Sequence, residues 1–315
     1  MIDIQNITFR YPGQSVPVFS DFSLRLSENR IYGLLGKNGT GKSTLLYLIA
    51  GLLRPQSGSV NCDTVAIDRT GAEAPDGPAA ASRPAAAPAH RREAGMLRDL
   101  FVVTEEFDLP AMTLEAYVRL VAPFYPRFSR EVLQGCLDDF ELPLSLRLNA
   151  LSMGQKKKVY MSIALAARTP LLLMDEPTNG LDIPSKSQFR RIVARNMADD
   201  QTLIISTHQV HDVEPLLDHL LILSDSALLL NASVQDLTDR YAFTLQPAGA
   251  IPAAVAGASS PVNGGTAAVN ADNDVLYAEP TLQGNAVITR RREGDPETPL
   301  NLELLFNAVT KGLLK

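Results

Sequence analysis

The first part of the chain alternates apolar and polar positions with a spacing near two, which is typical of strands with one buried face. Two such runs, at residues 2–9 and 22–26, flank the turn-rich sequence YPGQSVP. We expect them to pair as an antiparallel β unit. Residues 31–35 then form a short apolar run that ends in Gly36, and helical spacing begins after Gly41. A strand, a glycine-rich loop and a helix are therefore predicted in succession.

Strand and helix patterns alternate through the rest of the first 240 residues. Strands are expected at residues 59–60, 65–67, 100–104, 171–174 and 203–206, with a terminal hairpin at 220–223 and 228–230. Helices are expected at residues 113–124, 129–140 and 152–167, and from Pro184 onwards. The runs at 171–174 and 203–206 are apolar throughout, as in buried parallel strands. This alternation predicts an α/β protein with a mainly parallel central sheet.

Two stretches have a composition that does not support a packed core. Residues 68–95 are rich in Ala, Pro and Gly and are expected to form a mobile surface insertion. The sequence PAGAIPAAVAGASSPVNGG, after about Tyr241, is expected to be a linker or loop. Strand signals follow at 275–277 and 286–289, and LNLELLFNAV gives a final helical stripe. We therefore expect one domain over residues 1–240, and a linker with a small α+β accessory region over 241–315.

Charge, cysteine spacing and apolar content disfavour several classes of protein. The formal net charge of −6 over 315 residues argues against a protein whose whole surface binds nucleic acid and leaves local basic patches open. No nucleic-acid partner is expected. Cys62 and Cys136 lie far apart and lack metal-ligand spacing, which disfavours a zinc module. No apolar run approaches the roughly 20 residues of a membrane helix. Without a signal-peptide pattern at the start, the expected location is the cytoplasm.

The glycine-rich loop carries the strongest chemical signal. It fits the pattern G-x-x-x-x-G-K-[ST] and consists of Gly36, Lys37, Asn38, Gly39, Thr40, Gly41, Lys42 and Ser43. Main-chain N–H groups and a helix N-terminus favour phosphate oxygens there. Lys42 would bind the β- and γ-phosphates, the Ser43 hydroxyl would ligate Mg²⁺, and Thr44 would lie near the α-phosphate. The alternative is a glycine turn that merely contains a lysine, and the complete pattern between a strand and a helix disfavours it.

Two adjacent carboxylates end the apolar run at 171–174. In an open α/β sheet, ligands gather at the carboxyl ends of the strands. Asp175 could therefore hold the magnesium ion and Glu176 could polarise the attacking water. Alone, such a run is more often a strand that reaches its solvated loop. Together with the glycine-rich loop, it predicts a triphosphate hydrolysis site.

The motifs LSMGQ (residues 151–155) and MDEPTNGLD, followed by His208 after TLIIST, make residues 1–240 resemble the ATP-binding subunits of ABC transporters. The resemblance implies a P-loop NTPase core and a helical subdomain over residues 105–168. It implies that Ser152, Gly154 and Gln155, with Met153 in place of the family's glycine, cap the γ-phosphate of ATP on an opposite subunit. It further makes residues 178–182, with Asp182, the loop between two nucleotide sites. His208 becomes the histidine that contacts the γ-phosphate or the water.

The resemblance also makes Tyr11 the aromatic residue that stacks on adenine, whereas an ordinary exposed loop tyrosine is the alternative. One position departs from the family. Where a glutamine usually contacts Mg²⁺ after the strand at 100–104, this chain has Glu105 or, less favoured, Glu106. A carboxylate there remains an oxygen donor for Mg²⁺ but adds negative charge beside the phosphates.

Several other features are assigned ordinary structural roles. The lysines at 156–158 are interpreted as a solvated helix face, and His211 and His219 as solvated loop residues. The aromatic sequence APFYPRFS fits a groove for a permease helix and fits core packing equally well.

The resemblance implies an ATPase subunit that uses Mg²⁺ with ATP and works with a second ATPase subunit, either identical or homologous. A separate membrane permease would hold it at the inner face of the membrane, and the C-terminal extension favours export. A soluble ABC-type ATPase that acts on ribosomes or DNA is the main alternative. A regulatory nucleotide-binding module with impaired catalysis is a weaker one, and it rests on Glu105.

Overall fold

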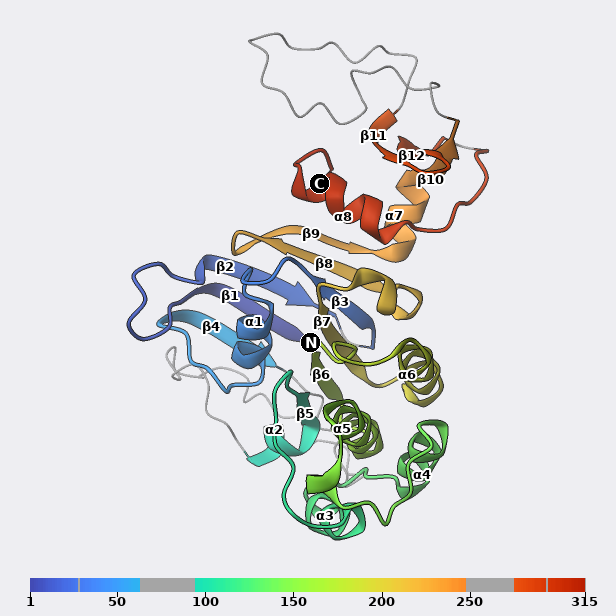
Figure 1. The fold of residues 1–315 in the computed structure, drawn as a ribbon. Coiled ribbons are helices and arrows are strands. Elements are labelled where there is room, and N and C mark those ends of the chain that lie inside the picture. Colours follow the sequence, from blue (N-terminus) through green and yellow to red (C-terminus); the bar gives the residue numbers. More distant parts are fainter. Residues whose placement is uncertain (28, 63–93, 248–274, 293, 315) are drawn as a thin grey trace, which may run out of the picture. The chain divides into compact units, whose positions relative to one another are not determined.

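The computed structural model describes residues 1–27, 29–62, 94–247, 275–292 and 294–314 (Figure 1). The expected strand at 65–67, most of the insertion at 68–95 and most of the linker after Tyr241 lie outside these residues. Contacts divide the chain into two compact units. The first contains Met1–Arg30 and Gly41–Ser206, and the second contains Ile31–Thr40 and Thr207–Lys315.

The first unit contains the expected antiparallel β unit. Its strands are β1 (Ile2–Phe9), β2 (Phe19–Leu26) and β4 (Ser57–Cys62), in the order β2-β1-β4. Ile4 pairs with Leu24 on one side and with Val60 on the other, and all three side chains are buried. Gly58 has a φ of 80°, and a Cβ atom there would lie 2.4 Å from the Gln5 carbonyl oxygen. The pairing of β1 with β4 therefore requires a glycine.

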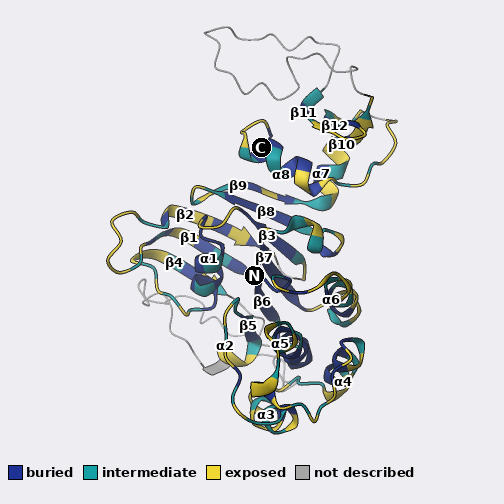
Figure 2. Ribbon diagram, viewed as in Figure 1, coloured by how far each residue is buried: buried dark blue, intermediate teal, exposed yellow. Residues whose placement is uncertain are grey.

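Parallel strands form the other sheet of this unit. They are β5 (Leu100–Val103), β6 (Leu171–Asp175) and β7 (Thr202–Thr207), in the order β5-β6-β7. Figure 2 shows β6 and β7 buried along their whole length, as the continuous apolar runs predicted. The register places Asp175, at the carboxyl end of β6, opposite Ser206 of β7.

The described helices of the first unit are α1 (Lys42–Ile49), α2 (Ala94–Asp99), α3 (Leu114–Val121), α4 (Arg130–Asp139), α5 (Met153–Ala167) and α6 (Ile183–Asn196). Four of them, α3 to α6, start at a side chain that caps them. The side chains of Thr113, Ser129 and Ser152 each accept a hydrogen bond from the N–H three residues later. A 3₁₀ turn continues α3 over Ala122–Phe124. Helix α2 begins at Ala94, so the last two residues of the insertion expected at 68–95 belong to a helix.

The second unit contains both parallel and antiparallel strands. β3 (Ile31–Leu35) is parallel to β8 (His219–Ser224), which forms the expected hairpin with β9 (Ala227–Ser233). The prediction that His219 is a loop residue is wrong. His219 opens β8, and its Nε2 lies 2.7 Å from Asn231 Oδ1 on β9.

The C-terminal part of the second unit is an α+β arrangement. After α7 (Val234–Arg240) come β10 (Tyr241–Gln246), β11 (Val275–Thr281), β12 (Gly284–Arg290) and α8 (Leu302–Thr310), with the strands in the order β10-β12-β11. β10 corrects the loop expected after Tyr241, because YAFTLQ is strand-like and pairs with β12. Helix α8 buries the apolar stripe predicted for it. In the described part of the chain, no helix combines the length and apolar character that a membrane span needs.

A candidate nucleotide-binding site

The glycine-rich loop connects β3 to α1 with the backbone that its sequence predicts. Gly39 and Gly41 have φ values of 83° and 98°, which glycine adopts without strain. A Cβ atom on Gly41 would also lie 2.8 Å from Phe19 Cζ. The Thr40 hydroxyl donates to the Lys37 carbonyl oxygen at 2.9 Å and closes the turn. No side chain caps α1, and its first turn contains no acidic residue. The start of α1 is therefore suited to an anion.

Lys42 and Glu176 form a buried ion pair. The Lys42 Nζ atom lies 3.6 Å from Glu176 Oε1, and each side chain is 6% exposed. Burial lowers the pKa of the Lys42 ammonium group, and the neighbouring Glu176 and Asp175 carboxylates oppose this shift. The lysine predicted to bind phosphate thus contacts the carboxylate predicted to activate water.

Asp175 has the features of a ligand for a hard cation. Its Oδ1 accepts a hydrogen bond from the Ser206 hydroxyl, whereas its buried Oδ2 has no hydrogen-bond partner among the residues that the structure describes. Burial raises the pKa of Asp175, and the hydroxyls of Ser206 and Ser43 oppose this shift. A buried carboxylate oxygen without a donor suits Mg²⁺, and Ser43 offers a second oxygen.

The described residues contain no group of three or more His, Cys, Asp or Glu side chains arranged to hold a metal. Mg²⁺ commonly binds through one or two protein oxygens and completes its shell with water and substrate phosphates. The pair of Asp175 and Ser43 therefore fits a magnesium ion that arrives with a nucleotide.

Glu176 leaves β6 in an unusual backbone conformation. Its φ of 45° lies in the left-handed region, which few residues other than glycine adopt. Its N–H donates to the Ser206 carbonyl oxygen at 3.0 Å, which holds the turn. The side chain is buried beside Lys42. Such local strain is often retained at functional sites.

Glu105 lies with these residues. The Asn179 side-chain amide donates to Glu105 Oε1 at 2.8 Å, and the Glu105 carboxylate opposes the fall in the pKa of Lys42. Glu106 instead contributes its carbonyl oxygen to the Thr104 hydroxyl. Of the two glutamates considered at this position, Glu105 is the one with a described contact to the site. Its role as a magnesium ligand stays a prediction.

Lys157 is buried, which contradicts the solvated position that the basic run predicted for it. The run at 156–158 was expected on a solvated helix face, but Lys157 is 5% exposed. Its Nζ donates to the carbonyl oxygens of Glu176 at 3.2 Å and Asn179 at 2.8 Å. Met161 and Ala164 are also buried, so the spacing i, i+4, i+7 places Lys157 on the packed face of α5. Lys157 therefore supports the loop that follows Asp175 and Glu176.

Replacing Lys157 with methionine is expected to lower the free energy of unfolding by about 1–3 kcal/mol, because two carbonyl groups lose their donor. Urea unfolding measures this change. Lys156→Met, which alters a half-buried neighbour, is the matched control and should change stability by less than about 0.5 kcal/mol. Equal losses of unfolding free energy in the two variants would show that the hydrogen bonds of Lys157 do not contribute to stability.

Residues of the LSMGQ motif cap a helix. The Gln155 N–H donates to Ser152 Oγ at 3.3 Å, and the Ser152 N–H donates to Gln155 Oε1 at 3.1 Å. Ser152 and Gln155 are exposed, and Gly154 is half-buried. Asp182 has the same kind of role at α6. Its Oδ1 accepts from the Ser185 N–H at 2.8 Å. Hydrogen bonds from the Ser185 side chain and from this N–H lower the pKa of Asp182.

Tyr11 lies beside the helix that follows the loop. Its hydroxyl is 3.0 Å from Thr44 Oγ1, and its ring packs edge-on against Phe9 with centroids 4.9 Å apart. Tyr11 is therefore held close to α1, and its stacking on adenine stays a prediction.

A site residue that sequence reasoning missed is Tyr47 of α1. Burial and the charge of Asp175 raise its pKa to about 12.

In the second unit, His208 and Gly36 line the same hollow, which has a volume of about 450 Å³. His208 is exposed and follows directly after β7. The first residue of the glycine-rich loop is thus near the histidine predicted to contact the γ-phosphate or the water. Phe306 and Asn307 of α8 line the same hollow. No motif or local pattern predicts that these two residues lie beside Gly36 and His208.

Comparisons with known proteins agree with these motifs. A family model described as ABC transporter matches residues 19–179. The methionine import ATP-binding protein MetN of Carboxydothermus hydrogenoformans is 31% identical over 250 residues, which cover 75% of this chain and 67% of that protein. The Nod factor export ATP-binding protein I of Rhizobium etli is 27% identical over 245 residues, covering 76% and 70%. A solved ATP-binding subunit of an ABC transporter matches with a TM-score of 0.59 and 25% identity, covering 75% and 91%.

Proposed function

Because the chain belongs to the ABC transporter family and is one of its ATP-binding cassettes, we propose that it hydrolyses MgATP with Glu176 as the general base and thereby drives a separate membrane permease. The observation that carries the proposal is the buried Lys42–Glu176 pair beside Asp175. This cluster supports the proposal because Lys42 can bind phosphate, Glu176 can accept a proton and Asp175 can bind a cation. The reaction class is in-line attack of water on the γ-phosphorus.

The Lys42–Glu176 contact supports a simple order of events. When the triphosphate binds, its β- and γ-phosphate oxygens attract the Lys42 ammonium group away from Glu176. The freed Glu176 carboxylate accepts a proton from the attacking water, whose oxygen bonds to the γ-phosphorus as ADP leaves. Ser43 and Asp175 are the residues that would hold Mg²⁺, which would supply positive charge beside the phosphate oxygens.

A second ATPase subunit is part of the proposal. The chain has one glycine-rich loop and one LSMGQ motif, and the exposed start of α5 leaves Ser152 and Gln155 accessible to another chain. A helix N-terminus with a serine hydroxyl favours an anion, such as the γ-phosphate bound by a partner copy. The proposed pair would hold two ATP molecules and attach to the permease at the inner membrane face.

The C-terminal extension favours export, whereas the relatives include an import protein, MetN, and an export protein for Nod factor. A soluble role on ribosomes or DNA remains the alternative from another class, and no observation of the described residues favours it.

The transport role is tested by isolating the tagged chain from detergent-solubilised membranes. We expect a membrane-spanning partner to copurify, and we expect ATP hydrolysis by the complex to fall when Glu176 is replaced with glutamine. If the chain sediments with ribosomes and is absent from the membrane fraction, the transport role is contradicted and the soluble alternative is supported.

A further inference from the structure

Helix α8 lines two hollows beside residues of the nucleotide site. Asn307 and Phe306 share one hollow with Gly36 and His208. Asn307, Thr310 and Lys311 share another, of about 470 Å³, with residues 37–40 of the glycine-rich loop. All of these residues belong to the second unit. The C-terminal helix is thus a neighbour of both the loop and the histidine segment.

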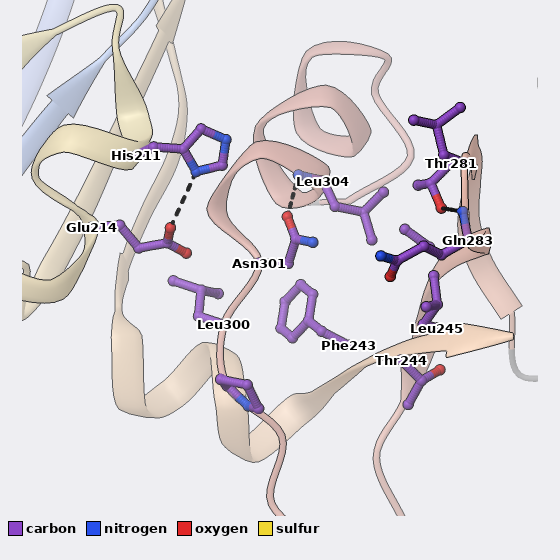
Figure 3. A pocket seen from close by; sticks show the side chains of 13 residues that line it. His211, Glu214, Phe243, Thr244, Leu245, Thr281, Gln283, Leu300, Asn301 and Leu304 are labelled. Atoms are coloured by element: carbon purple, nitrogen blue, oxygen red, sulfur yellow. Dashed lines mark hydrogen bonds and ion pairs between the residues drawn. The ribbon is translucent and has the colours of Figure 1, made fainter. Parts of the chain in front are cut away.

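Glu303 connects α8 directly to the segment that follows His208. Its Oε2 lies 2.8 Å from His211 Nε2, and Glu214 Oε2 lies 3.6 Å from His211 Nδ1. The other Glu214 oxygen accepts from the Leu302 N–H, in the first turn of α8, at 3.0 Å. Figure 3 shows the His211 ring directed toward Glu214, with the start of α8 at Asn301 and Leu304 nearby. His211 is therefore held between two carboxylates.

A short, hydrogen-bonded turn connects His211 to His208. His208 and His211 are three residues apart, and His211 is the middle residue of a 3₁₀ turn, Val210–Asp212. On one side, the Gln209 N–H donates to Thr207 Oγ1 at 2.9 Å. On the other, the Asp212 N–H donates to the Gln209 carbonyl oxygen at 3.2 Å. The two histidines are therefore linked by a short segment with its own hydrogen bonds.

We propose that Glu303 is a positioning residue for ATP hydrolysis, which fixes the His208 turn by binding His211 from the C-terminal helix. The inference rests on the proposed function, in which His208 contacts the γ-phosphate or the attacking water. Glu303 itself touches neither group. Replacing Glu303 is therefore expected to lower kcat and to leave the KM for MgATP unchanged, because the glycine-rich loop and Lys42 would still bind MgATP.

The charges around His211 give this role a pH dependence. The charged groups that face His211 are Glu303 on α8 and Glu214 on the next turn, and Asp212 adjoins it in sequence. The hydrogen bond to Glu303 is the main cause of a raised His211 pKa. A raised pKa means that the contact stabilises fully below the ordinary histidine value near 6.5 and is lost as pH rises through the folded-state pKa. The Glu303 effect is therefore largest in mildly acidic solution.

The test is a double-mutant cycle on the full chain, in whichever assembly hydrolyses ATP. Phosphate release is measured from about pH 6 to pH 9 for the wild type, Glu303→Gln, His211→Gln and the double variant. Each single variant should lower kcat about three- to tenfold near pH 6, with the KM for MgATP unchanged within about twofold. The double variant should be no slower than either single variant, and the differences should shrink as the pH rises across this range.

Controls separate positioning from folding. Glu297→Gln removes a carboxylate that is 84% exposed in the same unit and should leave kcat unchanged. Glu303→Asp retains the charge in the first turn of α8 and should recover part of the lost rate. Thermal unfolding of each variant reports on stability alone.

Two results would overturn the inference. One is a Glu303→Gln variant with the wild-type kcat and pH profile, even where its unfolding temperature falls. The other is a double variant whose losses simply multiply. These two results can be told apart from failure of the proposed function. If the proposed function is wrong, the wild-type chain itself releases no phosphate and Glu176→Gln changes nothing.

Discussion

Glu176→Gln is expected to reduce ATP hydrolysis about 10²- to 10⁴-fold, the usual range for loss of a general base, while MgATP still binds. Glutamine keeps the shape of the side chain but cannot accept the proton of the attacking water. It also removes the negative charge that holds Lys42 at 3.6 Å, so the lysine is more available to the phosphates. Phosphate release and calorimetric titration measure the two effects separately.

The matched control for this variant is Glu115→Gln. Glu115 lies on α3, and its side chain is 60% exposed. We expect wild-type hydrolysis from this protein. Hydrolysis by Glu176→Gln at a rate close to the wild type would remove Glu176 from the role of base and would direct attention to the neighbouring Glu105.

Lys42→Ala is expected to weaken MgATP binding about 10- to 100-fold, because hydrogen bonds to charged groups contribute roughly 1.5–3 kcal/mol. The variant also leaves Glu176 buried without its cation, so an uncompensated negative charge would face the incoming phosphates. Calorimetric titration of the purified chain with MgATP gives the dissociation constant. Hydrolysis should fall with binding.

Arg119→Ala provides the control for loss of a positive charge. Arg119 is 64% exposed on α3 and pairs only weakly with Glu115, at 3.8 Å. Its removal should leave the dissociation constant unchanged. The same affinity in Lys42→Ala and the wild type would contradict phosphate binding by the loop.

Local signals predicted the elements that carry the site. Glycine placement in the loop, serine and threonine caps at the helix starts, and unbroken apolar runs for β6 and β7 each act over a few residues. They therefore predicted the location of Asp175 at a strand end and of Lys42 at a helix start, and both predictions are confirmed. The assignment of these residues to nucleotide and magnesium stays a prediction.

Errors arose where distant contacts decide the environment of a residue. Lys157 lies in a basic run that is typical of a solvated helix, yet its ammonium group donates to carbonyl groups 19 and 22 residues away. Only the buried spacing toward Met161 and Ala164 gave a hint. The pairing of His211 with Glu303, 92 residues later, has no local signal at all. The strand β10 was missed because the Pro- and Ala-rich sequence after it dominated the pattern.

Whether the glycine-rich loop binds a nucleotide is decided by calorimetric titration of the purified chain with MgATP. We expect saturable binding of one nucleotide per chain, retained in Glu176→Gln and weakened in Lys42→Ala. If the folded protein releases or absorbs no heat of binding at any temperature tried, the loop does not bind MgATP.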